Sequence, residues 1–199
     1  MTTIRAILDN YATLCSCCDS FFSSILRLYK SEIRCAPGCH GCCELHSVCA
    51  IEAHALTAYL SGLPRRRGKR KRGKHLCALL ANRECTAYPA RPMICRTHGA
   101  ALLADTGATV FSSCDLNFTS VSPASLPRSH VFDTAAVTGN LMRLNTAFCM
   151  AAGAASLSPK RFTLDQVLRR AIPNSILFPE NASAGSKVRS QKFKVGSSK

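Results

Sequence analysis

The chain has 199 residues, which is enough for one well-cored domain but too short for two. Hydrophobic residues make up 47% of it, yet no run of about 18 apolar residues predicts a membrane-spanning helix. The start of the chain has no basic region followed by an apolar block, so no secretory signal is predicted and we expect a cytoplasmic protein.

The net charge of +15 is concentrated in two segments. Residues 65–74 carry eight positive charges and no acid, and residues 181–199 carry five more and no acid. Subtracting both from +15 leaves +2 for the remainder, so the folded body is nearly neutral. We interpret residues 65–74 as a solvated, flexible connection, with phosphate binding as the alternative.

Hydrophobic periodicity predicts helices over about 3–30, 48–61 and 134–152. The first is amphipathic, and Gly153 is a plausible stop for the third. A last helix is predicted from the capping box between Thr163 and Gln166, with Pro173 as its end.

Two turn-rich segments, about 34–49 and 75–98, separate these helices. We therefore expect a mainly α, small single domain with irregular cysteine-rich loops organised around a metal site. Its parts are an N-terminal amphipathic helix (1–33), a metal-binding region (34–118) with the basic insert, a helical C-terminal part (119–180) and a disordered basic tail (181–199).

Thirteen cysteines are far more than a chain of this size usually contains. Their number is odd and no export signal is predicted, so a reducing compartment would keep them as thiols. Metal ligation therefore explains them better than disulfides.

Four of them stand within nine residues, as Cys35-Ala-Pro-Gly-Cys39-His-Gly-Cys42-Cys43. The interposed Pro37-Gly38 prevents a helix from presenting all four, so the pattern predicts a loop that wraps around one positive centre. Thiolates are soft ligands that suit zinc, copper(I) and iron–sulfur clusters.

A second block and the segment after it supply further ligand candidates, namely Cys77, Cys85, Cys95 and, as a possible eighth, Cys114. Four thiols suffice for one site, and seven or eight could serve a binuclear one. Arg91 and Arg96 stand among them, and we assign them a cofactor-binding role. Their charge can offset the net charge of about −2 on a tetrathiolate zinc site or an oxidised four-iron cluster.

Together these blocks resemble the YkgJ-like cysteine-cluster family. The pattern Cys-x3-Cys-x2-Cys-Cys, then Cys-x-x-Leu, then Cys-x-x-Tyr-x-x-Arg-Pro-x-x-Cys-Arg matches at Cys35 to Cys43, at Cys77 and Leu80, and at Cys85 to Arg96. Cys114-Asp-Leu-Asn117-Phe118 is also similar to this family. The resemblance covers roughly residues 34–118 and departs from the family in the basic run. It implies a shared site that chelates zinc or iron, in a domain that the flagellin lysine N-methylases also carry.

Several alternatives remain open for individual residues. The spacing Cys35-x3-Cys39-x2-Cys42 is also that of the radical S-adenosylmethionine loop, although neither the length nor the element pattern predicts the partial α/β barrel of those enzymes. His40 or His98 could replace a thiol. Glu52 and His54 are either a second shell around the metal or an ordinary helix surface.

The cysteines outside these blocks have a simpler interpretation. We expect Cys15, Cys17, Cys18 and Cys149 to be small buried hydrophobic residues. Cys15 and Cys18 fall on or beside the apolar face of the first helix, whereas Cys17 points away from it.

Three functions follow. The first is a non-catalytic protein that chelates zinc or iron, with an iron–sulfur cluster favoured, in metal handling or redox function. The second is an iron–sulfur-dependent protein lysine N-methyltransferase-like enzyme, and the third is a zinc-stabilised nucleic-acid-binding protein that uses residues 65–74. Whether the chain is an enzyme, and which protein it contacts, stays open.

Overall fold

The computed structural model describes residues 3–63, 76–105 and 109–181, and these are 52% helical and 10% strand. The expected mainly α class is therefore confirmed. The basic insert 65–74 and all of the predicted disordered tail except Asn181 lie outside the described residues. In the described part, no helix is both long and apolar enough to cross a membrane.

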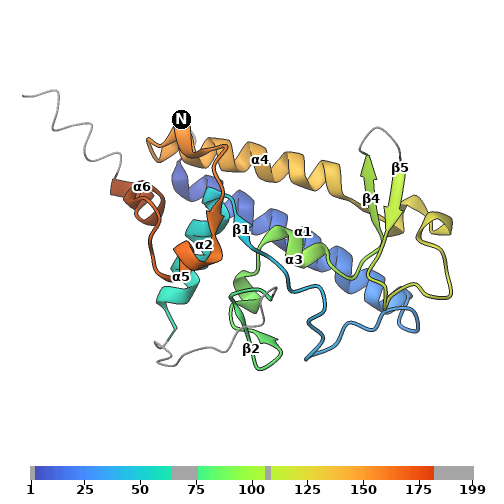
Figure 1. Cartoon of the computed structure of the whole chain (residues 1–199). Helices are drawn as coiled ribbons and strands as arrows, with labels where there is room; N and C mark the ends of the chain where they lie inside the picture. The colour runs from blue at the N-terminus through green and yellow to red at the C-terminus, as the bar shows by residue number, and fades with distance from the viewer. Residues whose placement is uncertain (1–2, 64–75, 106–108, 182–199) are drawn as a thin grey trace, which may run out of the picture.

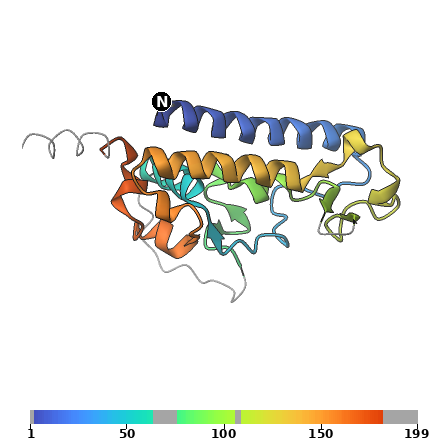
Figure 2. The ribbon, with the colours of Figure 1, turned by 90° about the horizontal axis from the view of Figure 1, so that it is seen from above.

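Two long helices, α1 (Ile4–Leu28) and α4 (Thr134–Ala151), run side by side along the molecule (Figures 1 and 2). The predicted periodicity holds for α1, whose buried face includes Ile7, Tyr11 and Ile25. Leu28, at the end of the predicted stripe, is 60% exposed because the helix ends there. Thr3 caps the start of α1 by accepting a hydrogen bond from the amide of Ala6.

Helix α4 also forms where the sequence predicts it, and both of its ends have a physical cause. Asp133 caps its N-terminus by accepting from the Ala136 amide at 2.9 Å. After its last residue, Gly153 adopts a φ of +64°, a left-handed conformation that glycine takes without steric cost. The predicted stop at Gly153 is confirmed.

The shorter helices are α2 (Ala50–Ser61), α3 (Met93–Thr97), α5 (Leu164–Leu168) and α6 (Asn174–Leu177), with 3-10 turns at Tyr88–Ala90, Pro123–Ser125, Arg128–His130, Ala155–Leu157 and Pro179–Asn181. Of these helices, α2, α5 and α6 lie toward the end of the molecule where the chain begins, and α3 lies along the middle of α1 (Figure 1). Helix α2 packs against α4, α5 and α6, while α3 packs against α1.

The last predicted helix is partly wrong. The capping box between Thr163 and Gln166 is present, and it begins α5 as expected. However, α5 ends at Leu168 rather than at Pro173, because Arg170 takes a left-handed φ of +54° that a helix cannot contain. Pro173 instead precedes the first residue of α6, a position where its fixed φ suits a helix start.

Three small sheets complete the described fold. Strand β1 (Ser47–Val48) pairs antiparallel with β7 (Phe162–Thr163), and β2 (Leu80–Ala81) pairs antiparallel with β3 (Glu84–Cys85). The third sheet has the order β5–β4–β6, in which β4 (Leu102–Asp105) runs antiparallel to β5 (Thr109–Ser112) and parallel to β6 (Phe132–Asp133). This third sheet was not predicted from the sequence.

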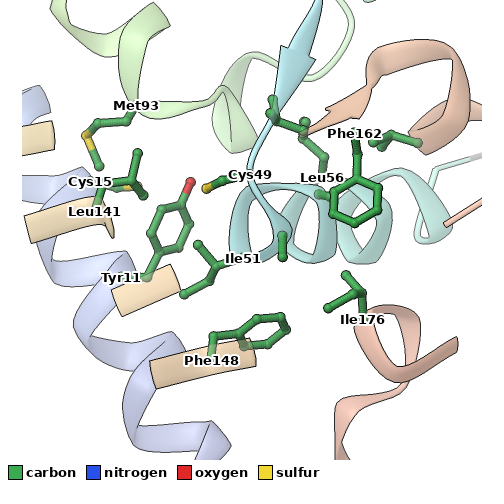
Figure 3. Packing of buried hydrophobic residues seen from close by; sticks show 14 of the residues in the cluster. Tyr11, Cys15, Cys49, Ile51, Leu56, Met93, Leu141, Phe148, Phe162 and Ile176 are labelled. Atoms are coloured by element: carbon green, nitrogen blue, oxygen red, sulfur yellow. The ribbon is translucent and has the colours of Figure 1, made fainter. Parts of the chain in front are cut away.

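The main core lies between α1, α2, α4 and the C-terminal helices (Figure 3). Phe148 of α4 and Ile51 and Leu56 of α2 are fully buried in it. A second, smaller cluster, which includes Ile25, Ile33 and Phe118, fills the far end of α1 beside the third sheet. The cysteine-rich loops lie against both clusters.

Candidate metal centre

All thirteen cysteines lie in the described residues, and none forms a disulfide. The first block, 34–46, is a loop, as predicted. It turns twice, with the Cys39 amide bonding to the Ala36 carbonyl at 3.0 Å and the Cys43 amide bonding to the His40 carbonyl at 3.0 Å. Gly38, with a φ of +88°, makes the first turn possible.

The electrostatic neighbours of each thiol divide the eight predicted ligands into two groups. The first set is Cys35, Cys39, Cys42 and Cys114, and the second set is Cys43, Cys77, Cys85 and Cys95. These two names are used below in this sense.

In the first set, burial is the main cause that raises the pKa of Cys35. A hydrogen bond from Asn117 opposes this rise, and the nearby charges of Cys39 and Cys114 add to it. Burial, followed by the charges of Cys35, Cys114 and Cys39, likewise raises the pKa of Cys42. The thiols that raise these two pKa values belong to the first set, while Cys42 in turn acts on Cys43 of the second set.

Asn117 joins the two chain segments that carry the first set. Its side-chain oxygen accepts from the Arg34 amide at 2.8 Å, and its Nδ2 donates to the Gly99 carbonyl at 2.8 Å and to the Cys35 Sγ at 3.3 Å. Its own amide bonds to the Cys114 carbonyl at 2.8 Å. Asn117 thus fixes Cys35 and Cys114 relative to each other, although they are far apart in sequence.

The Cys35 sulfur also lies against a glycine that no other residue could replace without movement. A Cβ built on Gly99 would approach the Cys35 Sγ to 2.6 Å and a ring carbon of Phe22 to 3.1 Å. The φ of Gly99 is +96°, which other residues rarely adopt. Backbone and sulfur can therefore approach closely only because residue 99 lacks a side chain.

The second set is joined by backbone hydrogen bonds. The Cys77 amide bonds to the Cys43 carbonyl at 2.7 Å, which ties the two cysteine-rich blocks together. From there β2 and β3 form a tight hairpin in which Leu80 pairs with Cys85. Cys95 follows in α3, which packs against α1.

The thiols of this set also act on one another electrostatically. Burial, followed by the charges of Cys77, Cys85 and Cys43, raises the pKa of Cys95 to about 12. Burial is also the main cause that raises the pKa of Cys43 to about 11, followed by the charges of Cys42, Cys77, Cys85 and Cys39. Cys43 therefore has thiol neighbours in both sets.

Neighbouring thiols are not the same as an assembled coordination shell. Among the described residues, no group of three or more His, Cys, Asp or Glu side chains is close enough together to hold a metal ion. A metal site at these cysteines therefore stays a prediction, as do the ligand roles of all eight.

Arg91 and Arg96 have a partner that the sequence did not suggest. Asp19 of α1 forms ion pairs with both guanidinium groups, at 2.5 Å from Arg91. Arg96 is 7% exposed and also donates to the carbonyls of Arg91 and Pro89 at 3.0 Å each. These contacts fix the second block to α1, while the predicted role in offsetting cofactor charge is untested.

The charge of Arg91 opposes the rise in the pKa of one thiol of the second set, Cys85. Burial raises the pKa of Cys85, whereas a backbone hydrogen bond from Ala87 and then the Arg91 guanidinium oppose that rise. Arg96 acts instead on Cys15, where it opposes the rise of the pKa that burial causes.

Glu52 is not part of an ordinary helix surface. It is 3% exposed, and its carboxylate accepts from the amides of Cys49 at 3.1 Å and Met93 at 2.9 Å. The Cys49 thiol donates to the same carboxylate at 3.4 Å. Glu52 therefore connects the start of α2 to the start of α3, which carries Cys95.

His40, considered as an alternative ligand, and His54, considered as part of a second shell, each contact a backbone carbonyl. The Nδ1 of His40 lies 2.9 Å from the Gly38 carbonyl, and that of His54 lies 2.8 Å from the Ile176 carbonyl, which connects α2 to α6. Since a carbonyl only accepts, each Nδ1 carries the proton. Burial lowers the pKa of His98, which stands at the C-terminal end of α3.

The remaining cysteines mostly match the expectation of buried hydrophobic residues. Cys15, Cys18 and Cys149 are buried, and Cys18 contacts the Met93 sulfur at 3.3 Å. Cys17 is exposed, as its place on α1 predicts, so the burial expected for it is wrong. Cys49, which the sequence analysis did not single out, is buried next to Tyr11 and Cys15 (Figure 3).

Comparisons of the chain with protein-family models, with curated proteins and with solved structures each found no match. The functional argument therefore rests on the residues themselves.

Proposed function

We propose that the chain is a cysteine-cluster protein that binds zinc or an iron–sulfur cluster through thiolates of the first and second sets, without catalysis of its own. The observation that carries this proposal is that hydrogen bonds bring the cysteine-rich segments together: Asn117 joins Cys35 to the segment of Cys114, and the Cys77 amide bonds to the Cys43 carbonyl at 2.7 Å. A tetrahedral zinc site and a four-iron cluster each take four thiolates.

Burial that serves only packing would not produce this arrangement. Cys39 and Cys42 are exposed, and most of the others are only partly buried, so the eight do not behave like the buried cysteines of α1 and α4. Their neighbours are one another rather than aliphatic side chains alone. A bound metal would neutralise the repulsion between thiolates that raises the pKa of Cys42 and Cys95 in addition to burial.

The same proposal includes two finer points. The motif from Cys35 to Arg96 supports membership of the YkgJ-like cysteine-cluster family. Thirteen cysteines without a disulfide support a reducing compartment, with the cytoplasm as its simplest form. Metal handling or redox function would suit both points.

The test is analysis of iron, zinc and acid-labile sulfide, with a visible absorption spectrum, on the full chain purified without oxygen. Stoichiometric iron and sulfide in a brown protein would support a cluster, and stoichiometric zinc without colour would support a zinc site. Cys17→Ser is the matched control, because Cys17 is exposed on α1 and belongs to neither set. Absence of all three elements in the wild-type chain would refute the proposal.

Two further assays test the alternative functions. Methyl transfer from labelled S-adenosylmethionine to a protein of a cell extract would identify the lysine methyltransferase-like enzyme. Salt-sensitive RNA or DNA binding that disappears when residues 65–74 are deleted would identify the nucleic-acid-binding protein.

A further inference from the structure

One short segment of the folded body concentrates its positive charge. Residues 160–170 contain four basic residues and one acidic residue, a net charge of +3, whereas the whole chain outside residues 65–74 and 181–199 carries +2. All four basic side chains are exposed, and we call them the basic patch: Lys160, Arg161, Arg169 and Arg170. The rest of the folded body is therefore close to neutral, and the patch is a distinct charged surface on it.

Two arginines of the basic patch are held in place by neutral partners. Arg161 donates from Nε to the Ser47 Oγ at 3.3 Å and from Nη2 to the Ser47 carbonyl at 2.6 Å. Arg170 donates from Nη2 to the Ser61 Oγ. Four other arginines form ion pairs instead, namely Arg5 with Asp9, Arg91 and Arg96 with Asp19, and Arg128 with Asp133. The hydrogen bonds of Arg161 and Arg170 thus orient the two guanidinium groups without offsetting their charge.

The two arginines contact opposite ends of α2. Ser47 precedes this helix and Ser61 is its last residue, and a helix of its 12 residues spans roughly 18 Å. Helix α5 separates Arg161 from Arg169 in the sequence and packs against α2 (Figure 1). The grooves of a double helix are about 6 and 12 Å wide, so cations this far apart can contact phosphates on both sides of one groove.

The apolar side chains of the same segment indicate which polyanion fits. Phe162, Leu164 and Val167 are buried, and no large apolar residue between 160 and 170 is exposed. A surface that binds anionic membranes inserts apolar side chains beside its cations, and one that binds single strands stacks bases on exposed aromatic rings. The segment offers neither, whereas guanidinium donors match the oxygens of a phosphate. Paired strands, contacted through their backbone, are therefore the favoured partner.

From these observations we propose that the basic patch binds the phosphate backbone of double-stranded nucleic acid, without selecting a base sequence. This interaction goes beyond the proposed metal binding and does not depend on it. It also differs from the alternative function that assigns nucleic-acid binding to residues 65–74, because the patch belongs to the folded body.

The experiment measures binding of the full chain to a fluorescein-labelled DNA duplex, and to an RNA duplex of the same sequence, by fluorescence anisotropy. Salt is varied between about 50 and 200 mM, because contacts with phosphates weaken steeply as salt rises. We expect binding, and the tighter duplex identifies the double helix that the surface prefers. No binding to either duplex in this range would overturn the inference.

Replacing all four residues of the basic patch by Gln should lower the affinity on the order of tenfold or more at about 100 mM salt. The slope of log affinity against log salt should also become less steep by about three to four, since each phosphate contact contributes roughly 0.9. The matched control removes as much charge at exposed positions outside the patch, with Arg27→Gln, Lys30→Gln, Arg34→Gln and Arg143→Gln. The control should change the slope by less than about one.

A second variant guards against loss of folding, because Arg161 and Arg170 also bond to Ser47 and Ser61. Lys160→Gln combined with Arg169→Gln leaves those bonds in place and should make the slope less steep by about two. Circular dichroism verifies that each variant is folded.

Three results would contradict the inference. If the control variant weakened binding as much as the patch variant, only the overall charge would matter. If deleting residues 65–74 abolished binding while the patch variant bound normally, the basic insert would be the binding segment. If the patch variant lost binding to phosphatidylserine vesicles but kept its duplex binding, the partner would be a membrane. None of these results bears on the metal analysis, so the proposed function would stand or fall separately.

Discussion

The side-chain amide of Asn117 donates a hydrogen bond to the sulfur of Cys35 at 3.3 Å, across 82 positions of the chain. The same side chain is 2% exposed and satisfies the Arg34 amide and the Gly99 carbonyl. One buried side-chain amide therefore connects three segments: the loop of the first cysteine block, the turn after α3 and the segment of Cys114. Its three partners have few other ways to find a hydrogen bond in this position.

Replacing Asn117 should consequently destabilise the chain. Asn117→Ala removes the hydrogen-bond partner of the Arg34 amide and of the carbonyl of the buried Gly99, and we expect a loss of roughly 2 kcal/mol in the free energy of unfolding. Urea denaturation followed by circular dichroism measures it. The control is Asn140→Ala, since Asn140 is exposed on α4 and its side-chain oxygen accepts a surface hydrogen bond from Arg143 at 2.6 Å. Equal losses in the two variants would contradict the role given to Asn117.

Gly99→Ala tests the close approach to Cys35. The new Cβ would lie 2.6 Å from the Cys35 Sγ at a φ of +96°, so we expect a loss of roughly 1–3 kcal/mol in the free energy of unfolding. Adding Cys35→Ala removes the sulfur and should recover part of that loss, while the contact with the Phe22 ring at 3.1 Å and the backbone strain would remain.

Gly41→Ala is the matched control for this pair, because nothing lies within 4 Å of a Cβ at that position. We expect a change below about 0.5 kcal/mol for it. If Gly99→Ala were equally mild, the sulfur and the backbone would not be in the close contact described.

Because Asp133 caps α4 with a charged side chain, we expect its contribution to the free energy of unfolding to depend on pH. The Ala136 amide, followed by the Arg128 guanidinium, lowers the pKa of Asp133 below its usual range. Because the pKa is lower in the folded chain, this stabilisation is complete above the unfolded pKa of about 3.9 and is lost as the pH falls through the folded value. Asp133→Ala should cost about 1 kcal/mol at pH 7 and less at pH 3.

Thermal unfolding at the two pH values measures the Asp133 effect. Asp9→Ala serves as its control, because the Asp9 carboxylate is exposed on α1 and forms a surface pair with Arg5 at 3.2 Å. A surface pair of this kind contributes less than about 0.5 kcal/mol. A cost of Asp133→Ala that did not shrink at low pH would exclude the charged cap as its cause.

The parts of the fold that were predictable are those encoded in local sequence. Nine apolar positions at helical spacing predict α1, and Thr163 with Gln166 predicts the start of α5. The third sheet was missed because its longest strands have four residues and because β5 and two 3-10 turns come between β4 and β6 in the sequence. Such pairing depends on tertiary contacts that no local pattern records.

For the candidate site, spacing alone selected eight cysteines but could not sort them. Which cysteines become neighbours depends on where the chain after Cys77 folds back, and contacts such as that of Asn117 with Cys35 set this position. Asp19 was missed for a similar reason, since an acidic residue on a helix gives no sign that Arg91 and Arg96 will reach it from 72 and 77 positions away. Glu52 was noticed beside the first cysteine block, and its place three residues after Cys49 was the available signal of a capping box.

Glu52 gives the last prediction, because its buried carboxylate connects α2 to α3. Glu52→Ala would leave the Cys49 and Met93 amides without their acceptor, and we expect a loss of about 2–4 kcal/mol in the free energy of unfolding. Glu52→Gln keeps the shape but turns an NH2 group toward one of the two donors, so it should recover only part of the loss. Hydrogen exchange of the Met93 amide should accelerate in both variants.

Glu44→Ala, at an exposed position of the cysteine loop, is the control and should leave that amide protected. Unchanged protection of Met93 in Glu52→Ala would show that α3 is held by other contacts, and that Glu52 does not position Cys95.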